Sequence, residues 1–204
     1  MLRSVTLVGL VLASGAAVAQ GPSFDCAKAE GGAEKLVCAD ADLAALDRLV
    51  AGRYAAALKV VRGLDSGAAE AEARLRAEQR GWIKGRDECW KDSDPRACVE
   101  LAYLSREGQL VARWGLEKPA EVVEWACDGN PSNRVVTSFF ATTLPAVLIE
   151  RGDSVDVGSL VPNEPGRKFE ASFGRSISIE GDTATYREPD PDGSILRCRR
   201  AGPA

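Results

Sequence analysis

Apolar residues recur at every second position through the C-terminal part of the chain, and Cys127 and Cys198 bracket most of this region. Val155 and Val157 alternate with polar neighbours, as in strands with one buried and one solvated face. The pattern predicts strands at residues 122–127, 134–140, 146–151, 154–160, 167–173, 176–180, 183–188 and 194–199. A disulfide between Cys127 and Cys198 would join the first strand to the last. We therefore expect a small, closed, antiparallel eight-stranded β-barrel, which leaves no strand edge exposed.

The N-terminal part has the helical period instead. From Leu43 to Val61 the apolar residues follow steps of three and four, with Asp40 or Asp42 placed to cap the helix and Gly63 to end it. Two further helices are predicted at residues 68–90 and 95–114. The fold class is thus α+β in two domains, with a disulfide-stapled three-helix domain before the barrel. The expected boundaries are a helical domain at residues 20–115, a linker at 116–124 and the barrel domain at 125–204.

Residues 1–19 have the features of a secretory signal peptide. Arg3 precedes an apolar stretch, and Ala17-Val18-Ala19 forms a small-residue cleavage site. No cysteine lies between residues 1 and 25, so no lipidation site follows the signal. We therefore expect a periplasmic or secreted protein without a membrane anchor.

Cysteines oxidise in that compartment, and six are present. Within the barrel domain Cys127 pairs with Cys198. The helical domain holds the other four, and we favour Cys26–Cys38 and Cys89–Cys98 because each bridge closes a short loop at a helix end. The crossed pairings of a stapled helical hairpin remain open at this point.

The chain contains no histidine, and this narrows the chemistry it can perform. Ser-His-Asp and Cys-His catalysis both need an imidazole base. No metal-binding motif, phosphate-binding loop or cofactor motif is present, so we expect no metal, no cofactor and no enzymatic activity. A hydrolase that works with paired carboxylates, acting on peptidoglycan, remains as an alternative.

The charge is mildly negative throughout, with 26 Lys and Arg against 30 Asp and Glu and a net charge of −4. Nucleic-acid binding requires a basic face, so this composition disfavours it. A cationic protein partner fits better, because complementary charge accelerates encounter.

Several segments of the helical part occur in a familiar order. They are Phe24-Asp25-Cys26, Glu34-Lys35-Leu36-Val37-Cys38, Leu43-Ala44-Ala45-Leu46-Asp47 with Tyr54, Gln79-Arg80-Gly81-Trp82-Ile83, Arg86-Asp87-Glu88-Cys89, Cys98, Tyr103 and Arg106. With this order and spacing, residues 24–114 resemble the LprI-like family of secreted bacterial proteins, which is named for a lysozyme inhibitor. The cluster around Trp82 and Arg86 is either a partner surface or an internal brace of the helix, and we favour the brace because tryptophan is usually mostly buried.

Residues 122–200 resemble the MliC/PliC family of c-type lysozyme inhibitors. The resemblance rests on Trp125 and Cys127, Pro165-Gly166-Arg167-Lys168-Phe169, Glu180-Gly181-Asp182-Thr183-Ala184 and Cys198. It implies a barrel whose loop and turn enter the cleft of a cationic c-type lysozyme. The implied contact residues are Pro165, Gly166, Arg167, Lys168, Phe169, Glu180, Gly181 and Asp182.

The chain departs from the family pattern at the two positions that carry its contacts. Pro165 stands where the family has serine, and Glu180 where it has lysine. We expect a nearby cation to replace the lysine, either Arg167, which shares the strand face of Phe169, or Arg175 at a turn. The alternative is an envelope binding or scaffold protein that keeps both folds without inhibiting lysozyme.

Overall fold

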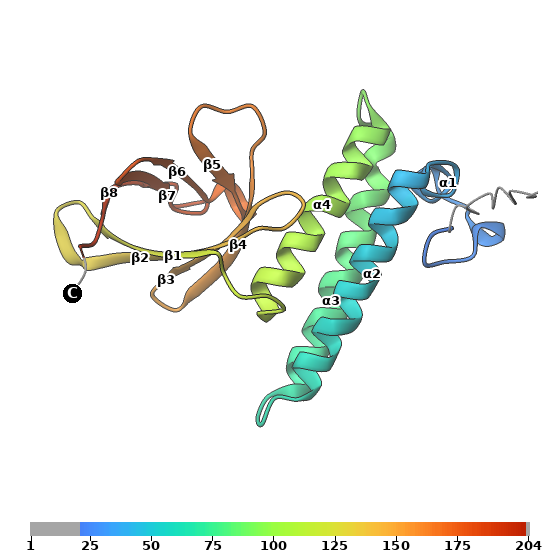
Figure 1. Cartoon of the computed structure of the whole chain (residues 1–204), viewed down its shortest axis with the longest axis horizontal. Coiled ribbons are helices and arrows are strands. Elements are labelled where there is room, and N and C mark those ends of the chain that lie inside the picture. The colour runs from blue at the N-terminus through green and yellow to red at the C-terminus, as the bar shows by residue number, and fades with distance from the viewer. Residues whose placement is uncertain (1–20, 203–204) are drawn as a thin grey trace, which may run out of the picture.

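The computed structural model describes residues 21–202, so the predicted signal peptide lies outside the described residues. Figure 1 shows an elongated molecule with helices at one end and the barrel at the other. The helical part comprises η1 (Cys26–Lys28), α1 (Gly32–Ala39), α2 (Ala41–Arg62), α3 (Ala68–Asp87), η2 (Glu88–Lys91) and α4 (Pro95–Trp114). Within residues 21–202, no helix is long and apolar enough to cross a membrane.

Two of the three long helices, α2 and α4, begin at the capping or first-turn residues that the sequence predicts. The Asp40 side chain accepts hydrogen bonds from the backbone N–H groups of Asp42 and Leu43 at the start of α2. Pro95 occupies the first turn of α4, and Gly115 ends that helix in the left-handed conformation.

The helix α1 was not predicted. This helix has only eight residues, of which Ala33 and Val37 are buried. Two apolar positions are too few to reveal a helical period in the sequence. The three-helix prediction therefore becomes a domain of three long helices and one short one. The cysteines pair as favoured, Cys26 with Cys38 and Cys89 with Cys98.

The C-terminal part is a closed antiparallel barrel in which each strand pairs with its neighbours in sequence. Its strands are β1 (Glu121–Cys127), β2 (Asn130–Phe140), β3 (Ala146–Arg151), β4 (Ser154–Leu160), β5 (Arg167–Glu170), β6 (Ser176–Glu180), β7 (Thr183–Arg187) and β8 (Ile195–Arg200). Strand β1 starts at Glu121, one residue before the predicted strand, so the last four residues of the expected linker at 116–124 belong to the barrel sheet. The predicted fifth strand ends early, at Glu170, and a short 3-10 turn (η3, Ser172–Gly174) replaces its second half.

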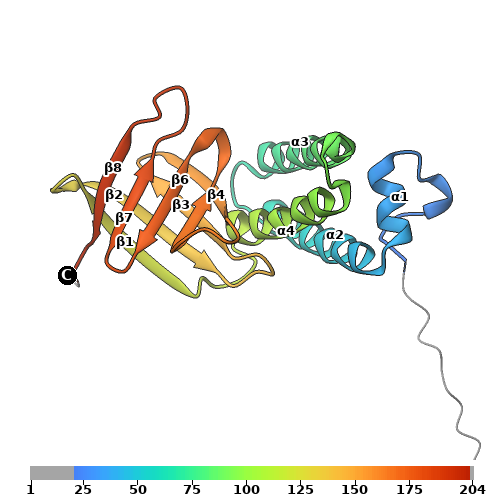
Figure 2. The same ribbon diagram turned by 90° about the horizontal axis from the view of Figure 1, so that it is seen from above.

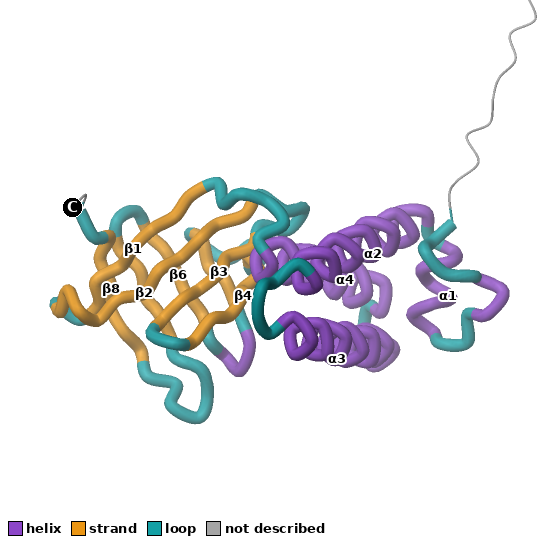
Figure 3. The backbone as a smooth tube through the Cα atoms, turned by 90° about the horizontal axis from the view of Figure 1, so that it is seen from below, coloured by secondary structure: helices purple, strands orange, loops and turns teal. Residues whose placement is uncertain are grey.

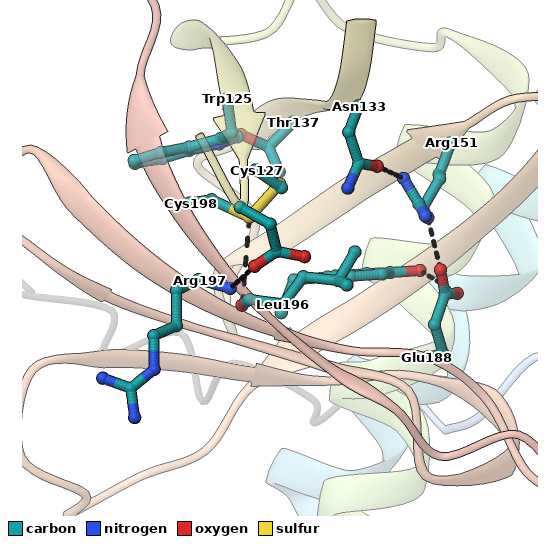
Figure 4. Close-up of a disulfide and its surroundings, with 11 residues drawn as sticks. Trp125, Cys127, Asn133, Thr137, Arg151, Glu188, Leu196, Arg197 and Cys198 are labelled. Carbon is teal, nitrogen blue, oxygen red and sulfur yellow. Dashed lines mark hydrogen bonds and ion pairs between the residues drawn. A yellow bond between two sulfur atoms is a disulfide. The ribbon is translucent and has the colours of Figure 1, made fainter. Parts of the chain in front are cut away.

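The disulfide between Cys127 and Cys198 closes the barrel. These residues face each other in the pairing of β1 with β8, and both are buried. Figure 4 shows Trp125 beside the bridge, where its indole N–H donates to the Thr137 hydroxyl at 2.8 Å. The covalent bond thus holds together the one strand pair that joins the two ends of the sheet.

A small hydrophobic core lies between the two domains, separate from the core of each. Helix α4 is the helix that lies against the barrel, as Figures 2 and 3 show. Val111 and Ala112 of α4 pack with Phe140, Ala146 and Val157.

The α4–barrel contact depends on close backbone approach and on polar bonds. A β-carbon on Gly108 would lie 2.7 Å from that of Ala146, so glycine is required there. The Thr143 N–H donates to the Glu107 carboxylate at 3.1 Å across the same interface. The helical domain and the barrel therefore form one body.

Candidate functional site

The two segments that the sequence singles out lie side by side at one end of the barrel. Residues 161–166 link β4 to β5, and residues 180–183 contain the β6–β7 turn; together we call them the loop–turn edge. Gly166 has a φ of +73°, and a β-carbon there would lie 3.1 Å from the Ile179 carbonyl oxygen and 3.7 Å from the Glu180 Cγ. The edge is therefore compact, and it depends on glycine at position 166.

Arg167 follows the loop and covers the end of the barrel core. Its guanidinium carbon lies 4.3 Å from the centre of the Phe139 ring and 5.8 Å from that of Phe169. Phe169 itself is 1% exposed, so it is a core residue and not a contact residue for a partner. Arg167 shares its strand face, as alternation predicts.

The cations of this edge are paired with neighbouring carboxylates. Arg167 lies 3.4 Å and Arg200 3.0 Å from the two oxygens of Glu121, and Arg200 also lies 3.4 Å from Asp182. The hydrogen bond from Arg200, joined by that from Arg167, lowers the pKa of Glu121. The positive charge of Arg167 is thus largely compensated within the protein.

Lys168 points away from the core, on the opposite strand face from Arg167. Its ammonium group lies 2.8 Å from Glu170, and this hydrogen bond raises the pKa of Lys168. It too carries its own counter-charge.

Arg175 does not belong to the loop–turn edge. It precedes β6, whereas Glu180 ends that strand, so the two residues lie at opposite ends of the barrel. Arg175 is 5% exposed and donates to the Ser154 hydroxyl at 2.6 Å. It is wrong as a candidate contact residue, because closeness to a turn in sequence gave no indication of which barrel end the turn occupies.

The structure adds two arginines that the sequence reading missed. Arg197 and Arg199 face outward from β8 and line a groove of about 690 Å³ on the outer barrel surface, together with Glu180. Within residues 21–202, neither side chain forms an ion pair or hydrogen bond. Strand alternation around the inward-facing Cys198 was the signal that could have found them.

Arg199 belongs to the same cross-strand row as the turn. Glu180 pairs with Thr183 across β6 and β7, and Thr183 pairs with Arg199 across β7 and β8. At roughly 4.8 Å per strand, the backbone of Arg199 lies about 10 Å from that of Glu180. The loop–turn edge is therefore bordered by a cation with no counter-charge of its own.

In the helical domain, the residues around Trp82 brace the fold. Arg86 is buried and donates to the Tyr103 hydroxyl at 2.8 Å, and Tyr103 donates to Asp47 at 2.9 Å. Burial lowers the pKa of Arg86, but Tyr103 and Asp87 outweigh it, so the net shift is upward. Trp82 packs edge-on against Tyr103 with ring centres 5.2 Å apart. The favoured interpretation as an internal brace fits these contacts.

Within residues 21–202, no group of three or more His, Cys, Asp or Glu side chains is placed to hold a metal ion. The described residues instead form a rigid protein with three disulfides, in which a helical domain is packed against a small closed barrel. The arrangement offers surfaces for binding.

Residues 26–110 match the family described as "Lysozyme inhibitor LprI", so the helical part of this chain is similar to that family. The chain is also 34% identical over 140 residues to "Lipoprotein LprI" of Mycobacterium bovis and of the CDC 1551 and H37Rv strains of Mycobacterium tuberculosis. The match covers 67% of this chain and 66% of each relative, slightly less than two thirds of their length. No solved structure matches this chain.

Proposed function

We propose that this protein is a secreted or periplasmic lysozyme inhibitor that binds a cationic c-type lysozyme and blocks its active-site cleft. The observation that carries the proposal is the match of residues 26–110 to a family described as a lysozyme inhibitor. The likeness to the LprI lipoproteins spans more residues than the helical part contains, so it extends into the barrel. The net charge of −4 favours encounter with a cationic enzyme.

The barrel would supply the segment that enters the cleft. Its loop–turn edge is held by the contact of Gly166 with residues 179 and 180 and by the ion pairs of Glu121. A preorganised edge loses little conformational entropy when it binds. The resemblance to MliC/PliC inhibitors points to the same edge.

The cation that meets the enzyme would be Arg199. A lysozyme cleft carries two catalytic carboxylates, and a cation placed between them forms charge-assisted hydrogen bonds. Glu180 would be repelled there, and Pro165 has no side-chain donor. Arg199 borders the turn and has no counter-charge within the described residues, whereas Arg167 is paired with Glu121.

The test is inhibition of c-type, g-type and i-type lysozymes by the purified protein, measured as the clearing of bacterial cell walls. We expect inhibition of the c-type enzyme, and an inhibition constant at least about tenfold weaker for Arg199→Gln. Lys59→Gln, an equal change of charge on an exposed face of α2, should leave inhibition intact. Equal inhibition by Arg199→Gln and the parent protein would assign binding to another surface.

The second candidate function is an envelope binding or scaffold protein without inhibitory activity, which Pro165 and Glu180 favour. No inhibition of any of the three lysozyme classes would support it. Cell-wall clearing by the purified protein alone would instead identify a carboxylate-based hydrolase.

A further inference from the structure

A cleft of about 410 Å³ lies between the two domains, and both contribute to its lining. Helices α3 and α4 supply Trp82, Arg106, Arg113 and Trp114, and the barrel supplies the start of β4 around Asp156. Small-molecule sites commonly occupy clefts of this size at domain interfaces. Since the domains pack as one body through α4, the walls of this cleft are fixed relative to each other.

Arg106 is the buried member of the lining, and among the described residues no carboxylate lies within salt-bridge distance of it. It is 5% exposed, and its nitrogens donate to the Gln79 amide oxygen at 3.0 and 3.1 Å and to the Gln109 amide oxygen at 3.2 Å. Within residues 21–202 it makes no ion pair. A guanidinium has five N–H donors, so two remain for a ligand. Burial lowers the pKa of Arg106, and the nearby Glu78 and Tyr54 offset this shift only in part.

Arg113 adds a second cation on the same helix, seven residues further along. Its side chain donates to the Val155 carbonyl at 3.0 Å, and within the described residues it has no carboxylate partner either. The neutral amides and the carbonyl orient both guanidinium groups, and neither group forms a salt bridge within the described residues.

The carboxylates of the lining are already engaged. Glu78 pairs with Arg74 at 3.0 Å. Asp156 accepts from the Ser172 N–H at 3.1 Å, from the Ser172 hydroxyl at 3.2 Å and from the Val157 N–H at 2.8 Å. Asp156 keeps its negative charge, because all three of these donors are neutral. The lining therefore carries three arginines (Arg74, Arg106 and Arg113) against two carboxylates (Glu78 and Asp156), and the resulting excess of one positive charge suits an anion.

Trp82 and Trp114 supply the apolar part of the lining, and both are half-buried. The indole N–H of Trp82 already donates to the Ala102 carbonyl at 3.1 Å, so this ring offers mainly apolar surface. A ligand that fits must combine a negative group with an apolar body.

We propose that this interdomain cleft binds a small monocarboxylate whose body is apolar or aromatic. The carboxylate lies between Arg106 and Arg113 and accepts charge-assisted hydrogen bonds, and the body packs on the two indole rings. This site is separate from the loop–turn edge and does not depend on the proposed inhibition of lysozyme.

The test uses the full-length mature protein and three probes, with binding measured by calorimetry. N-acetyl-L-phenylalanine carries both features, its amide lacks the carboxylate, and acetate lacks the apolar body. We expect N-acetyl-L-phenylalanine to bind at least about tenfold more tightly than either of the others. Its binding should also change the fluorescence of the parent protein, and the change should be smaller in Trp114→Phe, which keeps only Trp82 in the lining.

Variants separate the cleft from the rest of the surface. Arg113→Gln should weaken N-acetyl-L-phenylalanine binding about tenfold, and Arg106→Gln should abolish it. Because loss of a buried cation can disturb folding, Arg113→Gln decides the test where Arg106→Gln melts early. Arg80→Gln, an exposed change on α3, should bind as the parent does. Equal binding of acid and amide, absence of binding, or unchanged binding by Arg113→Gln would overturn the proposal.

Discussion

At the scale of single residues, charge compensation distinguishes the arginines of the barrel. Arg167 and Arg200 share Glu121, whereas Arg199 has no partner within the described residues. A bound carboxylate would have to replace Glu121 at Arg167 but would meet an available charge at Arg199. Under the proposed function we therefore expect Arg199, and not Arg167, to meet the enzyme.

Glu180→Lys tests whether the loop–turn edge enters a lysozyme cleft. Glu180 is exposed, so the change costs little stability, and it replaces repulsion of the catalytic carboxylates by attraction. We expect inhibition of c-type lysozyme to strengthen about tenfold or more. Asp153→Lys makes an equal change of charge in the β3–β4 turn at the opposite end of the barrel and should have a much smaller effect. Equal gains from both variants would mean that net charge, not the edge, sets affinity.

Because Tyr186 is buried, we expect the free energy of unfolding to fall at alkaline pH. The side chain is fully buried, and burial raises its pKa from 10.0 to about 12. Below pH 10 the folded and unfolded chains both keep the phenolic proton. Between pH 10 and 12 the unfolded chain ionises first, so the free energy of unfolding falls as the pH rises through this window.

Tyr186→Phe should reduce that fall by on the order of 2 kcal/mol, although the variant starts less stable at pH 7 because it loses the hydrogen bond to Glu188. Urea unfolding at pH 9 and pH 11.5 measures the difference. A residual fall is expected from Tyr103, whose pKa is also raised by burial. Identical pH dependence in variant and parent would show that Tyr186 ionises normally in the folded state.

At the scale of secondary structure elements, the contact of α4 with β3 fixes the position of the helical domain relative to the barrel. Gly108→Ala places a β-carbon 2.7 Å from that of Ala146, so the helix must shift. We expect a loss of 1–3 kcal/mol in the free energy of unfolding, roughly the cost of overpacking, despite the higher helix propensity of alanine.

Gly81→Ala is the matched control for this contact. Gly81 lies inside α3, and no atom lies within 4 Å of the β-carbon position, so alanine should stabilise by about 0.5–1 kcal/mol. Guanidinium unfolding of both variants measures the contrast. If both substitutions stabilise equally, the close approach of α4 to the barrel is not as the structure has it.

These elements also show what sequence alone can predict. Asp40 at the start of α2, Pro95 in the first turn of α4 and the alternation around Val155 placed two long helices and the strands, because these signals are local. Gly108 has no such signal, since a glycine inside a helix does not reveal what approaches it. Arg175 was misplaced for a related reason: only barrel closure shows which turns share an end.

At the scale of the whole molecule, the three disulfide bonds restrict the unfolded chain to different extents. The Cys127–Cys198 bridge spans 71 residues, whereas the Cys26–Cys38 bridge spans 12. Loop-closure entropy favours the longer span, at about 4 kcal/mol against about 3 kcal/mol. Replacing each pair by serine should therefore destabilise the barrel more than the helical domain, as thermal melting of the two variants would show. A larger loss from the shorter bridge would contradict this entropic account.

The final prediction concerns the two domains as separate molecules. The barrel core around Trp125 is distinct from the interdomain core, and β1 begins at Glu121. Residues 120–204 should therefore fold alone and keep c-type inhibition, although Phe140, Ala146 and Val157 lose the cover of α4.

In the barrel fragment, the apolar patch left exposed at Phe140, Ala146 and Val157 should lower the melting temperature and promote association of the fragment. Val157→Thr in this fragment should reduce the association without changing the inhibition constant. Residues 20–118 are the comparison, tested at the same concentration after both fragments are shown to be folded by circular dichroism. Inhibition by the helical fragment alone would assign the activity to the LprI-like helical domain and not to the barrel. Inhibition by neither folded fragment, but by the whole protein, would mean that lysozyme binds across both domains and that α4 fixes their relative position for this purpose.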